Sequence, residues 1–221
     1  MNTKFDLLIF DLDGTLVETR EDLAISVNVA LASEGLPVLP METVVRFVGD
    51  GALKLVQRSV GEGFPDSIYE SVLGAFLSHY QDHCTDHCEC YPGVEATLEQ
   101  LEPLRLSVLT NKPIGPTTRI LDHLKLSSCF DQVIGGDHEL GRKPDPAGLI
   151  SLIESAGASP ARTLLVGDTS VDVLTARNAG CNVAGVQFGF RPGDFAEHPP
   201  DYLLDAFPGL IDILLKSDEP G

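Results

Sequence analysis

The stretch Leu7-Leu8-Ile9-Phe10-Asp11-Leu12-Asp13-Gly14-Thr15 decides the fold class of this chain. Four apolar residues are followed at once by acidic residues, a glycine and a hydroxyl residue, a pattern typical of a buried parallel strand that ends in a functional loop. Further short apolar runs come later, at residues 106–109, 132–134, 163–166, 183–186 and 202–204. Helix-length segments lie between them, at residues 94–104, 117–126, 147–156 and 171–179. Strands that alternate with helices predict an α/β fold with a Rossmann-like parallel sheet covered on both faces.

Residues 18–90 interrupt this alternation, because apolar residues recur there at helical spacing and no strand is predicted. Three sets of residues are expected to share one helical face each: Leu23, Val27, Ala30 and Leu31; Leu53, Val56, Gln57 and Val60; and Ile68, Val72, Ala75 and Phe76. The chain thus leaves the sheet after its first strand and returns near Tyr91. We expect a core domain at residues 1–17 and 91–221, and an all-helical cap domain at residues 18–90.

The composition is that of a globular protein, with 43% hydrophobic and 22% charged residues among 221. Lys and Arg number 15 and Asp and Glu number 33, so the formal net charge is −18 at pH 7. A chain this acidic repels the phosphates of nucleic acids and anionic membrane surfaces, so neither is an expected partner. A small anionic substrate would need cations placed locally in its site.

The sequence shows no sign of a membrane or export segment. No apolar run reaches the roughly 18 residues of a membrane span, and the N-terminal residues lack the pattern of a secretory signal. Five cysteines, an odd number, fit no disulfide framework and suit a reducing compartment. We expect a cytoplasmic protein that is a monomer or a homodimer.

Polar side chains follow the ends of several predicted strands. They are Asp11 and Asp13 after the first strand, Thr110 and Asn111 after the second, Lys143 in the loop between the third and fourth, and Asp168 and Asp172 after the fourth. Ligand sites in open α/β sheets form beyond the carboxyl ends of the strands, so we expect these side chains to converge. Carboxylates are hard oxygen ligands that suit Mg²⁺, which completes its coordination with water and substrate phosphate.

Four motifs in this order, with a helical insert after the first, resemble the haloacid dehalogenase-like phosphohydrolases along essentially the whole chain. The motifs are Asp11-Leu12-Asp13-Gly14-Thr15, Thr110-Asn111-Lys112-Pro113, Arg142-Lys143-Pro144 and Gly167-Asp168-Thr169-Ser170-Val171-Asp172. The second and third motifs are similar to those of the phosphoglycolate phosphatase branch of that family. Two further segments share this similarity, Gly135-Gly136-Asp137 and Phe47-Val48-Gly49-Asp50-Gly51-Ala52. The resemblance implies a Mg²⁺-dependent phosphomonoesterase that hydrolyses 2-phosphoglycolate to glycolate and phosphate.

The resemblance also implies catalytic and substrate-binding roles. Asp11 would attack phosphorus and form an aspartyl-phosphate. Asp13 would act as general acid on the leaving oxygen and then as general base on the attacking water. Thr110, supported by Asn111, would hydrogen-bond the phosphoryl group, and Lys143 would neutralise its charge.

The implied Mg²⁺ site consists of the Asp11 side chain, the Asp13 backbone carbonyl and Asp168, with Asp172 orienting these ligands or their waters. Two carboxylates and a phosphate dianion carry more negative charge than Lys143 alone can offset, so this interpretation requires the metal. Asp172 has a second interpretation, as a carboxylate in the first turn of a helix that interacts with the helix dipole.

Other activities are compatible with the same motifs. A phosphatase for sugar phosphates, amino-sugar phosphates or pyrophosphate would carry them, and so would a phosphomutase. A dehalogenase with a nucleophilic Asp and no metal would not need Asp13. A non-catalytic binding module would not need the nucleophile, acid/base, lysine and metal ligands together.

In the predicted cap, Gly49, Asp50 and Gly51 form the loop expected to reach the substrate, because glycines permit a close backbone approach. An ordinary helix–helix turn explains the same residues equally well. The cations available in or near the cap for a substrate carboxylate are Arg20, Arg46, Lys54 and Arg58, and the sequence does not rank them.

A cluster of histidines and cysteines lies outside the family pattern, at His79, His83, Cys84, His87, Cys88 and Cys90. The three histidines are spaced by four residues and would share one face of a continuous helix. A site for Zn²⁺ or a similar metal is one hypothesis. A polar helix end with buried thiols is the interpretation that we favour, because no second spaced pair of ligands is present.

Overall fold

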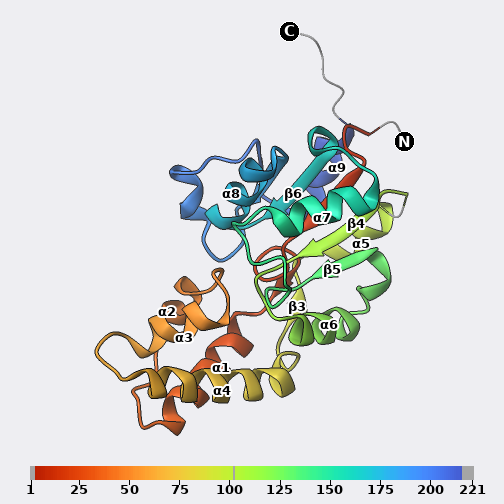
Figure 1. Cartoon of the computed structure of the whole chain (residues 1–221). Coiled ribbons are helices and arrows are strands. Elements are labelled where there is room, and N and C mark those ends of the chain that lie inside the picture. The colour runs from red at the N-terminus through yellow and green to blue at the C-terminus, as the bar shows by residue number, and fades with distance from the viewer. Residues whose placement is uncertain (1–2, 102, 216–221) are drawn as a thin grey trace.

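The computed structural model describes residues 3–101 and 103–215 and shows a six-stranded parallel sheet (Figure 1). In spatial order the strands are β5 (Gln132–Ile134), β4 (Arg105–Leu109), β1 (Leu7–Phe10), β6 (Thr163–Gly167), β7 (Asn182–Val186) and β8 (Tyr202–Leu204). The strand that carries the opening motif thus lies inside the sheet, between β4 and β6. The predicted α/β fold is confirmed, and β8 is an edge strand.

The core surrounds β1 on both faces. All four of its side chains are fully buried, as its uninterrupted apolar run predicts for a central parallel strand. Leu8 and Phe10 belong to one apolar cluster, whereas Leu7 and Ile9 belong to the other, because successive side chains of a strand point to opposite faces. Burial on both sides holds the end of β1 rigidly, and Asp11 follows there.

Helices cover the two faces of the sheet separately. The first cluster contains residues of α5 (Val94–Gln100), α6 (Ile114–His123) and α9 (Leu210–Leu215), and the second contains residues of α7 (Ala147–Ala156) and α8 (Ser170–Ala179). The remaining short helices are η1 (Ser127–Cys129), η2 (Pro160–Arg162), η3 (Pro192–Ala196) and η4 (Phe207–Gly209). The doubly covered sheet matches the prediction from alternating strands and helices.

Several helix boundaries differ from the prediction, among them the end of α6 at His123 rather than residue 126 and the start of α8 at Ser170 rather than residue 171. Helix α5 ends at Gln100 rather than at residue 104, because Pro103 cannot continue a helix. Helix α6 begins at Ile114 rather than at residue 117, and includes Pro116 in its first turn, where no intrahelical N–H bond is needed. Its earlier start places the helix directly after the Thr110-Asn111-Lys112-Pro113 motif.

The helical insert consists of α1 (Arg20–Ser33), α2 (Met41–Arg46), α3 (Ala52–Val60) and α4 (Asp66–His83), which form a separate group beside the sheet (Figure 1). Helix α1 packs mainly on α4, and its predicted apolar face is buried. The predicted face of α3 is partly wrong. Leu53 is 39% exposed, and the buried face centres on Leu55, Val56 and Val60.

A short antiparallel ribbon joins the insert to the core. Strand β2 (Val17–Glu18) pairs with β3 (Glu89–Cys90), so that Val17 faces Cys90 across the ribbon. The expectation of no strand in residues 18–90 is therefore wrong at both ends, because two-residue strands show no periodicity in a sequence. The ribbon lies where we predict the two crossings between core and cap, and these domain boundaries stay a prediction.

Candidate active site

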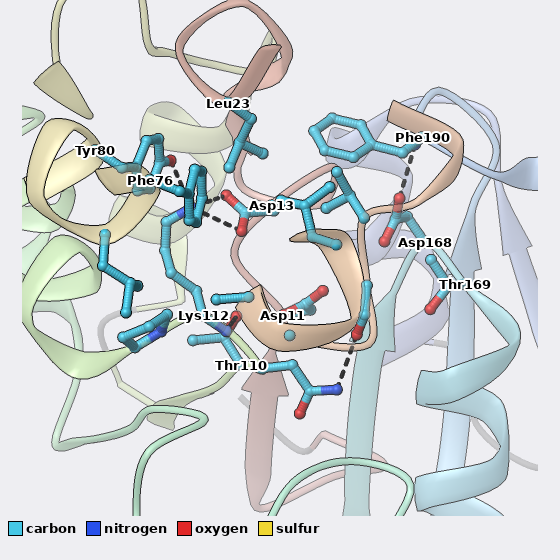
Figure 2. A pocket seen from close by; sticks show the side chains of 18 residues that line it. Asp11, Asp13, Leu23, Phe76, Tyr80, Thr110, Lys112, Asp168, Thr169 and Phe190 are labelled. Carbon is cyan, nitrogen blue, oxygen red and sulfur yellow. Dashed lines mark hydrogen bonds and ion pairs between the residues drawn. The ribbon is translucent and has the colours of Figure 1, made fainter. Parts of the chain in front are cut away.

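Of the predicted catalytic side chains, those of Asp11, Asp13 and Thr110 line one pocket at the carboxyl edge of the sheet (Figure 2). Asp11 follows β1, Thr110 and Asn111 follow β4, and Asp168 follows β6. These four residues line the pocket together with Asp13. The pocket has an empty volume of about 590 Å³, which includes open solvent at its mouth. The convergence expected from strand ends is what the structure shows.

Lys143 lies between two of the buried carboxylates. Its Nζ atom is 2.9 Å from Asp11 Oδ1 and 2.6 Å from Asp172 Oδ1, and the lysine is only 6% exposed. Burial lowers the pKa of Lys143, but the two carboxylates outweigh burial and the pKa is raised. Lys143 is therefore a permanent cation beside Asp11, although it stands behind the pocket rather than in its lining.

Three buried carboxylates are close enough to bind one metal ion. Asp11, Asp168 and Asp172 each offer an oxygen atom, and these atoms lie within 4.8 Å of one another. Burial raises the pKa of Asp11 to about 6, against the lowering effect of Lys143, and raises the pKa of Asp168 well above its usual value. A divalent cation would relieve this crowding of negative charge, so the donor set fits Mg²⁺.

The carboxylate oxygens of Asp11 and Asp172 differ in how many contacts they already make, and this distinguishes the two as candidate metal ligands. Asp11 Oδ1 is buried, and its contact within the described residues is the ion pair with Lys143 Nζ at 2.9 Å. Both oxygens of Asp172 are taken, one by Lys143 and the other by the N–H and hydroxyl of Thr169 at 3.1 and 3.0 Å. Asp11 is thus the freer ligand, and Asp172 is held in an orienting position.

Gly14 is required by the closeness of Asp168. Its φ angle is +79°, and an added Cβ atom would lie 2.3 Å from Asp168 Oδ2. The same Oδ2 accepts a hydrogen bond from the Phe190 N–H at 2.7 Å (Figure 2). The glycine of the opening motif therefore leaves room for a carboxylate that follows β6, the strand paired with β1.

Asp13 forms an ion pair that the sequence analysis does not anticipate. Lys112 Nζ donates to its two carboxylate oxygens at 2.7 and 2.8 Å, and the Thr19 hydroxyl donates to Oδ1 at 2.7 Å. Lys112 also donates to the Tyr80 hydroxyl, which comes from α4, at 2.6 Å. The signal for Lys112 was its place in the Thr110-Asn111-Lys112-Pro113 motif. Tyr80 has no comparable signal.

The cap loop meets the core at Asn111. The Asn111 side-chain amide donates to the Gly49 carbonyl at 2.8 Å and to the Lys143 carbonyl at 2.9 Å. Gly49 and Gly51 line the pocket. Asp50 does not, since its carboxylate is turned to Arg58, 2.6 Å away.

Comparison with known proteins identifies the family. A model of the haloacid dehalogenase-like hydrolases matches residues 8–186. The chain belongs to this family. Full-length relatives of this hydrolase include a phosphoglycolate phosphatase of Haemophilus influenzae strain 86-028NP, 36% identical over 97% of this chain and 100% of the relative. Phosphoglycolate phosphatase 1 of Pseudomonas aeruginosa is 37% identical over 96% of this chain and 80% of the relative.

Solved structures agree with this assignment. The crystal structure of a predicted phosphoglycolate phosphatase from Haemophilus somnus 129PT superposes with a TM-score of 0.90 at 33% identity, covering 96% of this hydrolase and 98% of that chain. A predicted phosphatase from Clostridium acetobutylicum superposes with a TM-score of 0.83 at 23% identity, over 94% and 97% of the two chains, and shows the same fold. Among the described helices of the hydrolase, none is both long and apolar enough to cross a membrane.

The cap side of the pocket in this hydrolase is mainly apolar. Its lining residues from the insert include Leu23, Val48, Leu55, Phe76 and Leu77. The four cap-region cations considered above do not line the pocket. Arg58 pairs with Asp50, and Arg20 lies 3.3 Å from Glu18 and donates to the Gly189 carbonyl. Among the described lining residues, Lys112 is the only lysine or arginine.

The histidines and cysteines near the end of α4 do not gather into a metal site. His79 bonds Ser26 at 2.9 Å, His83 bonds Asp86 at 2.8 Å, and His87 bonds Asp22 at 2.8 Å. Within residues 3–101 and 103–215, only the three active-site aspartates form a potential metal-binding group. The zinc hypothesis is therefore not supported. The cluster is a polar helix end, with free and buried thiols at Cys84 and Cys88.

Proposed function

We propose that this hydrolase is a Mg²⁺-dependent phosphatase that converts 2-phosphoglycolate to glycolate and phosphate. The observation that carries the proposal is the arrangement around Asp11. This buried carboxylate lines the pocket at the sheet edge, with Lys143 at 2.9 Å and Asp168 close enough to share a metal ion. Relatives named phosphoglycolate phosphatase match the chain along nearly its whole length, which supports the choice of substrate.

Asp11 and Asp13 carry the chemical steps in this proposal. An oxygen of Asp11 forms a bond to phosphorus while the ester P–O bond breaks. Asp13, whose carboxylate is paired with Lys112 in this structure, must first take up a proton, which it then gives to the leaving oxygen. Water then attacks the aspartyl-phosphate as Asp13 takes one of its protons. The water oxygen stays on phosphorus, and Asp11 is released as a carboxylate.

The remaining residues bind and orient the phosphoryl group. Lys143 offsets its negative charge, and the Thr110 hydroxyl, with Asn111 in support, donates a hydrogen bond to it. Asp172 holds Lys143 in place through the 2.6 Å ion pair. Asp11, Asp168 and the Asp13 backbone carbonyl would hold Mg²⁺, which supplies further charge neutralisation when bound.

The lining of the cap favours a small leaving group over a sugar. Hydroxyl groups of a bound sugar would face Leu23, Val48, Leu55 and Phe76, which offer no side-chain hydrogen bonds. Buried hydroxyls without partners lose binding free energy, so an apolar wall selects against them. Glycolate has only two carbons and one carboxylate to place.

The test is a comparison of kcat/KM for 2-phosphoglycolate, a sugar 1-phosphate and pyrophosphate, each with Mg²⁺ and with a chelator. We expect a clear preference for 2-phosphoglycolate, lost on chelation and in the Asp11→Asn variant. A preference for another ester would overturn the substrate and keep the chemistry. An isomeric sugar phosphate in place of free phosphate would show a phosphomutase instead.

A further inference from the structure

Two buried polar side chains of the pocket, Tyr80 and Lys112, have no role in the chemical steps above. Tyr80 comes from α4 in the insert and Lys112 follows β4 in the core, and both line the pocket (Figure 2). Tyr80 is 2% exposed and Lys112 is 6% exposed. The Lys112 ammonium donates to the Tyr80 oxygen at 2.6 Å, which joins cap and core inside the pocket.

Counting donors shows that Tyr80 has a proton to offer. A lysine ammonium carries three N–H donors, and those of Lys112 reach the two Asp13 oxygens and the Tyr80 oxygen. Because an ammonium cannot accept, Tyr80 must accept in this bond, and its own O–H proton finds no acceptor among the described residues. Burial raises the pKa of Tyr80 well above its usual value, so the hydroxyl keeps that proton.

Among the described residues that line the pocket, this pair is where a second anion would meet both a hydrogen-bond donor and a cation. Leu23, Leu55 and Phe76 present apolar surface on the cap side, and Lys112 is the only cation in the described lining. A buried carboxylate needs both a donor and a nearby positive charge. A hydroxyl that already accepts a bond from an ammonium is also a stronger donor.

We propose that the Tyr80–Lys112 pair recognises the carboxylate of the leaving group, with the Tyr80 hydroxyl as direct donor and the Lys112 ammonium behind it. The inference rests on the proposed function and adds the residues that select the substrate. The enzyme then prefers small phosphate monoesters whose alcohol carries a carboxylate. Since Tyr80 belongs to the insert and Lys112 to the core, recognition requires the two to be in contact, as they are in this structure.

The experiment measures a ratio of two kcat/KM values, one for 2-phosphoglycolate and one for ethyl phosphate, in the presence of Mg²⁺. The two esters have the same number of carbons and differ in the carboxylate, so any general loss of activity cancels in the ratio. Tyr80→Phe removes a single oxygen atom. We expect it to lower the ratio by roughly 10- to 100-fold, the effect of losing a hydrogen bond to a charged group.

Tyr69→Phe is the matched control, because the Tyr69 hydroxyl also lies in α4 but donates to the Gly61 carbonyl outside the pocket. It should leave the ratio unchanged. Lys112→Met should lower the ratio as well. Because Lys112 also pairs with Asp13, this variant should also change kcat/KM for both esters alike, and that shared change cancels in the ratio. A wild-type ratio near one would overturn both the proposed substrate and this inference. A high wild-type ratio that Tyr80→Phe preserves would overturn the inference alone.

Discussion

At the scale of single residues, the site depends on the charge balance around Lys143. Its ammonium is buried between Asp11 and Asp172, with Asp168 close to both carboxylates. One cation therefore lies among three carboxylates, all of them buried. A buried charge that loses its partner is costly, so we expect the lysine to stabilise the fold as well as the phosphoryl group of the proposed substrate.

We predict that Lys143→Met lowers kcat/KM by at least about 100-fold, comparable to the loss of one preorganised charge-stabilising donor. In metal-free protein the free energy of unfolding should fall by about 3–5 kcal/mol, because Asp11 and Asp172 are left uncompensated. Urea unfolding with and without Mg²⁺ measures the stability change. Lys54→Met, an exposed lysine of α3, is the control and should change neither quantity. Near wild-type turnover in Lys143→Met would contradict the assigned role.

At the scale of elements, Asp172 in the first turn of α8 contacts both the residue that begins the helix and the buried lysine of the site. Thr169 stands directly before the helix, and its N–H and hydroxyl both donate to Asp172 in the first turn. The other oxygen of Asp172 pairs with Lys143. The two interpretations of Asp172 are thus compatible, since one carboxylate both stabilises the helix start and contacts the lysine.

We predict that Thr169→Val lowers the free energy of unfolding by about 1–2 kcal/mol, the range for losing a cap or a hydrogen bond to a charged group. Turnover should fall as well, because Asp172 loses one of the contacts that fix it against Lys143. Thr169→Ser retains the hydroxyl and should restore most of both losses. Thermal unfolding and steady-state kinetics on the two variants provide the comparison. Equal behaviour of the Val and Ser variants would refute the coupling.

At the scale of the whole molecule, function depends on the contact between the insert and the sheet edge. The pocket is lined from both sides, and Asn111 bridges them by donating to Gly49 in the insert and to the Lys143 carbonyl in the core. The Tyr80–Lys112 contact is the second bridge. The pocket as described therefore depends on the contact of the insert with the sheet edge.

We predict that Asn111→Leu, which removes the amide and adds no charge, lowers kcat/KM by at least about 10-fold through the lost bridge. Amide hydrogen exchange should become faster at residues 47–51, because the cap loop loses its anchor. Asn28→Leu is the control, since the Asn28 amide donates to the Leu39 carbonyl within the insert. It should leave exchange at residues 47–51 unchanged. Unaltered exchange in Asn111→Leu would show that the bridge does not hold the loop.

Much of the architecture is encoded locally, so the sequence alone predicts it. The apolar run before Asp11 identifies a central strand because burial on both faces demands uninterrupted apolar residues. Asp11, Thr110 and Asp168 meet because each follows a parallel strand, and parallel strands end at one edge. Leu53 was wrongly placed on a buried face and the β2–β3 ribbon was missed, because a helix of 9 residues or a two-residue strand carries too little periodicity.

The sequence by itself thus determined the fold class, the order of the motifs and the aspartates that gather at the sheet edge. Only the tertiary structure decided which partners the charged groups take. Lys112 pairs with Asp13 across 99 positions of sequence, and Asp50 turns to Arg58 rather than into the pocket. Such pairings depend on how the insert packs against the sheet, because side chains meet through the relative placement of whole elements. Local periodicity contains no information about that placement.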